Sequence, residues 1–85
     1  MANYRINVRK SAAKELGVFP TKDLQRIADK ILALATDPRP FGAEKLSGDP
    51  KYRIRQGVYR ILYEVDDQAL VVTIVKIGHR REIYR

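Results

Sequence analysis

Hydrophobic residues alternate with polar residues near the start of the chain and again in three runs near its end. Residues 4–8 (YRINV) show the two-residue period of a half-buried strand. Residues 51–55, 58–65 and 70–77 repeat the pattern and are separated by short polar turns. Short turns between neighbouring strands predict an antiparallel three-stranded meander.

Between these runs, apolar residues recur at helical spacing. A short helix is predicted over residues 12–16, with Ser11 as its N-cap and Gly17 as its end. A second helix is predicted to begin near Thr21 and to end before Pro38, because a residue that precedes proline avoids the helical conformation. The expected core stripe of this helix comprises Leu24, Ile27, Ala28, Ile31, Leu32 and Ala35.

Residues 38–50 are rich in Pro, Gly, Ser and Asp and show no periodicity, so they are predicted to form a loop. The order of elements is therefore an N-terminal strand, a hairpin of two helices and three further strands. Such a chain forms an α+β fold in which the helical hairpin packs on one face of a single sheet. The 85 residues suffice for one domain, residues 1–85, and not for two.

Charge and composition narrow the classes of partner and of chemistry. The chain carries 17 Lys or Arg and 10 Asp or Glu, and its net charge of +7 favours RNA, DNA or an acidic protein as partner. With a single His and no Cys, a catalytic zinc site is not expected. No cofactor is expected. The N-terminal residues contain no apolar run that resembles a signal peptide or membrane span, so a cytoplasmic protein without membrane contact is expected.

Arginines concentrate in the predicted meander, where several can reach one face. Arg53 and Arg55 share a side because strands have a period of two residues, and Arg60 lies on the next strand. Arg80 follows the third strand, which should return alongside the second. Guanidinium groups match phosphate oxygens bidentately, so this set is suited to hold a backbone phosphate. The alternative is that Arg53 and Arg55 only protect an edge strand from aggregation.

Cleavage of RNA requires little beyond such a surface. The ribose 2′-hydroxyl is the nucleophile, so a protein has to align it, stabilise charge on the phosphoryl oxygens and move protons. Candidates for proton transfer are Tyr84 and His79, because histidine is a common general acid or base in enzymes, although His79 is equally well explained as an ordinary loop histidine. Arginine is a poor base because it stays protonated. Tyr52, Tyr59 and Tyr63 are interpreted as core or sheet-face aromatics rather than as platforms for bases.

The runs KLSGDPKYRIRQGVYRILYEV (residues 45–65) and VKIGHRREIYR (residues 75–85) resemble the RelE toxins of the RelE/ParE superfamily of bacterial and archaeal toxin–antitoxin systems. The resemblance covers essentially the whole chain, including the early strand, the helical hairpin and the Asp-Pro-Arg loop. It implies the RelE-like (microbial RNase-like) fold and cleavage of mRNA in the ribosomal A site without a metal. It also implies an antitoxin that covers this surface or displaces the C-terminal element.

Carried over by motif, the resemblance assigns roles to individual residues. Arginines are expected to bind phosphate and stabilise charge, and the C-terminal tyrosine to orient the substrate or transfer a proton. The catalytic positions are Arg53, Arg55, Arg60, Arg80 and Tyr84. Further basic residues expected to contact RNA are Lys45, Lys51, His79, Arg81 and Arg85. Well-known members have lysines in place of Arg53 and Arg55, so the general base is left open.

The leading expectation is a type II toxin: an mRNA endoribonuclease that works on the ribosome and forms a hetero-oligomer with an acidic, RelB-like antitoxin. One alternative is a ParE-like toxin of the same fold that inhibits DNA gyrase. The other is a non-catalytic module that binds RNA or the ribosome. The set of Arg53, Arg60, Arg80 and Tyr84 favours the endoribonuclease, because gyrase inhibitors generally lack the complete set.

Overall fold

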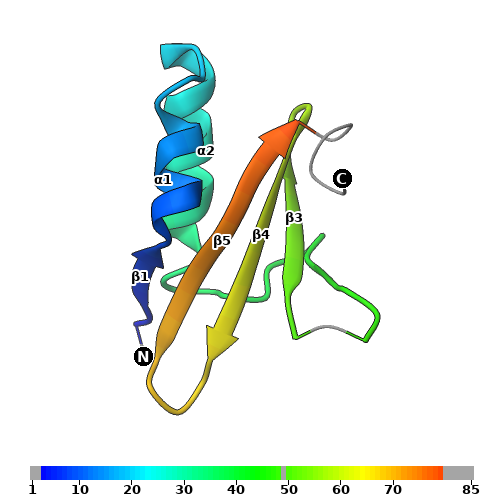
Figure 1. Ribbon diagram of the computed structural model, residues 1–85. Helices are drawn as coiled ribbons and strands as arrows, with labels where there is room; N and C mark the ends of the chain where they lie inside the picture. Colours follow the sequence, from blue (N-terminus) through cyan, green and yellow to red (C-terminus); the bar gives the residue numbers. More distant parts are fainter. Residues whose placement is uncertain (1–2, 49, 80–85) are drawn as a thin grey trace.

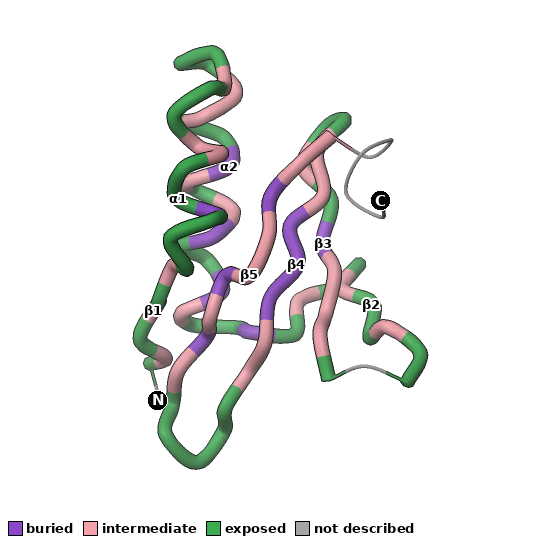
Figure 2. Tube along the Cα trace, viewed as in Figure 1, coloured by how far each residue is buried: buried purple, intermediate pink, exposed green. Residues whose placement is uncertain are grey.

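A computed structural model describes residues 3–48 and 50–79. Its elements, in chain order, are β1 (Arg5–Val8), α1 (Lys10–Leu16), α2 (Thr21–Ala33), β2 (Glu44–Lys45), β3 (Tyr52–Gln56), β4 (Tyr59–Asp66) and β5 (Val71–His79). The strands form one sheet in the order β1-β5-β4-β3-β2. Figure 1 labels β1, β5, β4 and β3, and Figure 2 adds β2 beside β3. Neighbouring strands from β2 to β5 are antiparallel, whereas β1 pairs with β5 in parallel. The α+β fold with its antiparallel meander is confirmed, and β1 and β2 widen the meander to five strands.

Helix α1 begins earlier than predicted, because the chain leaves β1 and turns directly into the helix. Its N-cap is Arg9, whose backbone N–H still donates to the Ile74 carbonyl at 3.0 Å. Ser11 lies inside the helix, and its hydroxyl donates to the Val75 carbonyl at 3.5 Å, so the predicted Ser11 cap is wrong. Gly17 does follow the helix as predicted, with a right-handed φ of −68°. α1 thus continues along the edge of β5 where β1 ends.

Helix α2 supplies most of the helical side of the core. Ile27, Ile31 and Leu34 are no more than 5% exposed. Leu34 was absent from the predicted stripe, and Leu32, which was included, is 63% exposed. The reason is geometric: consecutive residues are about 100° apart around a helix, so Leu32 cannot share the narrow face of its neighbour. Among the described residues, no helix is long and apolar enough to cross a membrane.

The sheet buries one face against the helices. The inward residues of β3, β4 and β5 join the helical residues in one cluster, and buried segments run along all three strands (Figure 2). The fully or nearly fully buried strand residues in this cluster are Ile54, Ile61, Tyr63, Val72, Ile74 and Ile77. Burial of each large aliphatic side chain contributes about 1.5–3 kcal/mol. This one-sided burial leaves the alternate residues of the same strands on the opposite face.

The β3–β4 hairpin turns through two residues, Gly57 and Val58, one position later than the sequence predicts. Gly57 has a φ of 60°, the left-handed value that the first position of a type II′ turn requires and that glycine adopts most easily. A tight turn fixes the register of the strands that it joins. In this register Arg55 lies directly opposite Arg60.

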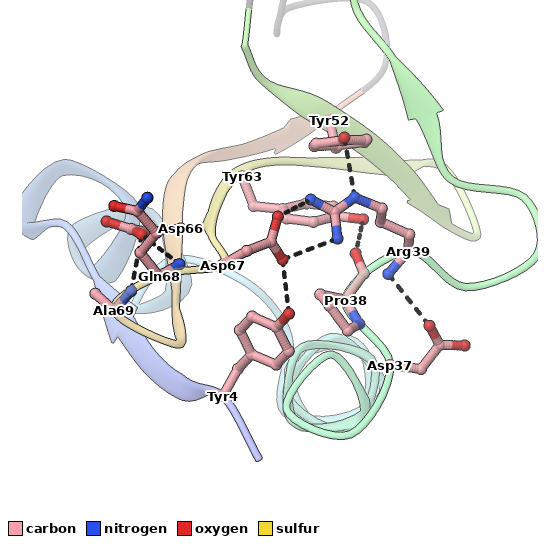
Figure 3. Close-up of polar contacts among 10 residues, drawn as sticks. All are labelled: Tyr4, Asp37, Pro38, Arg39, Tyr52, Tyr63, Asp66, Asp67, Gln68 and Ala69. Carbon is pink, nitrogen blue, oxygen red and sulfur yellow. Dashed lines mark hydrogen bonds and ion pairs between the residues drawn. The ribbon is translucent and has the colours of Figure 1, made fainter. Parts of the chain in front are cut away.

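A polar cluster fixes the segment that follows α2 to the sheet (Figure 3). The guanidinium of Arg39 donates to both carboxylate oxygens of Asp67, at 3.2 and 2.8 Å, and its Nε donates to the Tyr52 hydroxyl at 3.0 Å. The Tyr4 hydroxyl donates to Asp67 Oδ1 at 2.6 Å. The cluster therefore connects the residue before β1, strand β3 and the β4–β5 turn to the loop that carries Arg39.

An Asp67→Asn variant is expected to be less stable than the parent near neutral pH and to converge on it in acid. Hydrogen bonds from Arg39 and Tyr4 lower the pKa of Asp67 in the folded chain. A carboxyl with a lowered pKa stabilises the fold above its unfolded pKa, about 3.9, and this contribution disappears as pH falls through the folded value. Urea unfolding of both proteins, from neutral pH to a pH below the folded pKa of Asp67, checks the prediction. A difference that is equally large in acid would contradict it.

Candidate nucleic-acid interface

The sheet face that points away from the helices carries the arginines of β3 and β4. Ile54 and Ile61 point into the core, with exposures of 2% and 0%. Because side chains alternate along a strand, their neighbours Arg53, Arg55 and Arg60 lie on the opposite face. The structure thus brings three of the predicted positions together from two adjacent strands.

Arg55 and Arg60 form a directly opposed pair of like charges. Such a pair destabilises a sheet, by up to about 1 kcal/mol relative to neutral residues. Within residues 3–48 and 50–79, Arg55 makes no hydrogen bond or ion pair, and Arg60 makes a long contact of 3.5 Å to the Tyr59 carbonyl. Two guanidinium groups side by side become favourable when an anion binds both. The arrangement is therefore that of an anion-binding surface.

Arg53 is held by a carboxylate that the sequence did not reveal. It forms an ion pair with Glu44, which lies directly opposite it on β2. The side chain of Arg53 is 21% exposed and that of Glu44 is 56% exposed. Residues 38–50 were predicted to be a loop throughout, and this is wrong at β2, because two residues are too few to show a strand period. Glu44 orients Arg53 along the face that it shares with Arg55.

Lys76 adds a cation to the same face, and strict alternation along β5 would not have placed it there. Lys76 pairs with Leu62, whereas the next pair is Tyr63 with Ile74, so Val75 is an extra residue in β5. A bulge of this kind inverts the alternation on either side of it. It places Lys76 with the arginines.

His79 lies on the helix side of the sheet. It pairs with Tyr59 across β4 and β5, and the two ring centroids are 6.5 Å apart, edge to face. The Tyr59 hydroxyl donates to Asp23 on α2 at 2.8 Å, and its ring packs against Phe19 at 4.7 Å. The Asp23 hydrogen bond, together with desolvation, raises the pKa of Tyr59. The predicted role of His79 requires it to lie on the same face as the arginines. The structure places it on the opposite face of the sheet.

The remaining predicted positions are less closely grouped. Lys45 lies opposite Tyr52, so alternation turns it away from the face of Glu44. Lys51 directly precedes β3, and its carbonyl accepts the backbone N–H of Leu46 at 2.9 Å. The other four lie outside the described residues: Arg80, Arg81, Tyr84 and Arg85.

Two hollows lie between helix α2 and the β3–β4 hairpin. One has a volume of about 190 Å³ and is lined by Asp23, Arg26 and residues 56–59. The other, about 120 Å³, is lined by Lys30, Phe41, Gly42, Ile54 and Arg55. Sites for whole small molecules usually occupy about 300–1,000 Å³, so neither hollow suits a bound organic cofactor. In the described part of the chain, no three His, Cys, Asp or Glu residues are grouped to hold a metal ion.

The chain is similar in sequence to known toxins along nearly its whole length. Residues 6–84 match the family described as ParE toxin of type II toxin-antitoxin system, parDE. Toxin RelG of Mycobacterium tuberculosis is 29% identical over 96% of this chain and 97% of its own. The mRNA interferase toxin RelE of Escherichia coli is 29% identical over 95% of this chain and 90% of its own.

The fold agrees with these sequence matches. A chain in the crystal structure of the archaeal RelE–RelB complex from Pyrococcus horikoshii superposes with a TM-score of 0.84 at 30% identity. The superposition covers 94% of this chain and 98% of that chain. The family match and the shared fold both extend across the helical hairpin and the arginine-bearing meander. The chain therefore belongs to the RelE/ParE superfamily and is a toxin of a type II toxin–antitoxin system.

Proposed function

We propose that this toxin is an endoribonuclease that cleaves mRNA on the ribosome, and hence acts in the cytoplasm. The observation that carries the proposal is the directly opposed pair of Arg55 and Arg60, with Arg53 on the same face. An arrangement that costs stability in the free protein is well explained by an anionic ligand that binds between the two guanidinium groups. The similarity to an mRNA interferase toxin supports RNA as that ligand.

In the proposed reaction, the 2′-hydroxyl oxygen attacks the adjacent phosphorus and the bond to the 5′-oxygen breaks. The 2′-hydroxyl loses a proton, the leaving 5′-oxygen gains one, and the upstream product ends in a 2′,3′-cyclic phosphate. Arg55 and Arg60 bind the non-bridging phosphoryl oxygens, where negative charge grows in the transition state. Arg53, oriented by Glu44, binds a neighbouring phosphate. This scheme needs no metal because the substrate carries its own nucleophile.

Residues near the C-terminus complete the proposed site. Arg80 is assigned to charge stabilisation and Tyr84 to orientation of the substrate or proton transfer. The flanking residues Lys45, Lys51, Arg81 and Arg85 are assigned to RNA contacts away from the reacting phosphate. The site holds no evident strong base, because arginine stays protonated. The ribosome is therefore proposed to contribute by aligning the 2′-hydroxyl with the phosphorus.

We also propose that an acidic, RelB-like antitoxin forms a hetero-oligomer with this chain and silences it. The net charge of +7 supports an acidic partner. The similar chain from Pyrococcus horikoshii was crystallised as a RelE–RelB complex. An antitoxin that covers the arginines would compete directly with the phosphates of RNA.

The second candidate function is inhibition of DNA gyrase, which the match to the ParE toxin family favours. Two reactions with the purified toxin separate the candidates: cleavage of mRNA on programmed ribosomes, and DNA supercoiling by gyrase. The proposal expects cuts within the A-site codon and full gyrase activity. Intact mRNA together with inhibited gyrase would replace the proposal by the second candidate. Toxin that binds ribosomes and affects neither reaction would indicate a non-catalytic module.

A further inference from the structure

We propose that Phe41 is a stacking platform for one nucleobase of the RNA whose phosphate is bound by Arg55. The inference rests on the proposed function and extends it to a base-binding position beside the arginine face. It is carried by the exposure of the Phe41 ring, by the cations around it and by the anchoring of its loop.

The Phe41 side chain is fully exposed, at 106% of its reference area, whereas the next most exposed large hydrophobic side chain in the described part of the chain is Val18 at 77%. Single exposed apolar residues are ordinary on protein surfaces and by themselves indicate nothing. An aromatic ring with both faces free is, however, the form in which proteins stack single-stranded bases. The surroundings of the ring decide between these two interpretations.

Phe41 lines the 120 Å³ hollow together with Lys30 of α2, and with Ile54 and Arg55 of β3. The lining includes two cations and no carboxylate, so the hollow suits an anionic ligand better than an apolar or basic one. Its volume is well below the range of about 300–1,000 Å³ for a complete small-molecule site. A flat, neutral base that lies against Phe41 fits this volume, and the two cations of the lining are available to the phosphate attached to that base.

Arg55 connects the hollow to the arginine face. It lines the hollow, and it also lies directly opposite Arg60 across β3 and β4. The Arg55 side chain is therefore shared between the hollow, which lies on the side of β3 that faces α2, and a phosphate bound together with Arg60. The base attached to that phosphate, or to the next one, is the group that reaches Phe41. β2 pairs with β3 only at Tyr52 and Arg53, so it does not cover the β3 edge beside Arg55.

The loop that carries Phe41 is anchored on both sides, which limits the entropy lost when a base binds. Before it, Arg39 is fixed by its hydrogen bonds to Asp67 and Tyr52. After it, the Ala43 N–H donates to the Pro40 carbonyl at 2.9 Å. Between them, Gly42 has a φ of 95°, a conformation that residues with a side chain rarely adopt. The backbone thus presents the Phe41 ring outward in a defined position.

The chain contains no Trp, so a Phe41→Trp variant carries a single fluorescent indole at the proposed platform. The test is to titrate this variant at low salt with a single-stranded RNA whose 2′-O-methyl groups block cleavage. A parallel titration uses inorganic polyphosphate. Stacking is expected to quench the indole with RNA and not with polyphosphate. Phe41→Ala and Phe41→Leu are both expected to weaken RNA binding about 5- to 150-fold, equivalent to about 1–3 kcal/mol per stacked base. Phe41→Tyr should retain affinity, and Val18→Ala is the matched control for an exposed apolar residue.

Each outcome decides for or against the platform. Full RNA affinity in the Phe41→Leu variant overturns the inference, and so does RNA binding that leaves the indole fluorescence of the Phe41→Trp variant unchanged. If Arg60→Ala still abolishes cleavage in that case, the proposed function survives. A Phe41→Leu variant that loses affinity for its antitoxin while keeping RNA affinity assigns the residue to a protein interface instead. Wild-type toxin that binds no RNA at low salt and cuts no mRNA on ribosomes overturns both proposals. Because Phe41 is fully exposed, these variants are expected to fold like the parent.

Discussion

Replacement of Arg60 by alanine is expected to lower the rate of mRNA cleavage on programmed ribosomes by on the order of a hundredfold to a thousandfold. The guanidinium of Arg60 is assigned to the phosphoryl oxygens, where it acts most strongly in the transition state. The same substitution removes one member of the like-charge pair with Arg55. Stability is therefore expected to stay constant or to rise by about 0.2–1 kcal/mol. Single-turnover cleavage and urea unfolding measure the two effects.

The combination of lost activity and retained stability distinguishes a functional residue from a structural one. Arg5→Ala is a matched control, because Arg5 lies opposite Val71, which itself pairs with Asp66 at the far end of β4 from Arg60. This control should cleave at the parent rate. An Arg60→Ala toxin that is correctly folded and fully active would remove Arg60 from the site. A variant that loses stability in step with activity would assign it a structural role.

Replacement of Tyr63 by alanine is expected to destabilise the fold by about 3–5 kcal/mol, the range for large aromatic side chains in a core. Tyr63 is 0% exposed, stacks on Tyr52 at 5.7 Å and donates its hydroxyl to the buried Pro38 carbonyl at 2.7 Å. Tyr63→Phe keeps the ring and leaves this carbonyl without its donor, so it should cost about 1–3 kcal/mol. Burial, with a smaller effect of Tyr52, raises the pKa of Tyr63 to about 12, so the hydroxyl stays a donor at neutral pH.

Urea unfolding of the two Tyr63 variants and the parent gives both differences. The Tyr63→Phe variant should cleave mRNA at the parent rate, because the ring lies in the core and not on the arginine face. A Phe variant as stable as the parent would show that the bond to Pro38 contributes nothing. Lost cleavage in a stable Phe variant would contradict the interpretation of Tyr63 as a core aromatic.

The meander and its arginines could be predicted because they follow the two-residue period of strands. That period alone places Arg53 and Arg55 on one side, and the glycine turn at Gly57 implies a hairpin that brings Arg60 beside them. What the period does not specify is the exact register. The direct opposition of Arg55 and Arg60 depends on the turn having two residues, Gly57 and Val58, and became visible only in the structure.

Other parts of the site depend on contacts between distant segments and could not be predicted. β2 is too short to show a period, so the pairing of Glu44 with Arg53 was missed. The extra residue in β5 inverts the alternation before Lys76 and puts His79 on the helix side. The bulge has no local sequence signature here, because residues 71–75, which lead into it, are all β-branched.

The most direct test of the central claim is to induce this chain alone in bacteria and map mRNA 5′ ends with and without active translation. The account predicts new ends within translated codons that disappear when translation is blocked. An Arg60→Ala chain, expressed at the same level, should produce none of them. Growth arrest with intact mRNA and altered DNA supercoiling would contradict the account and identify gyrase as the target.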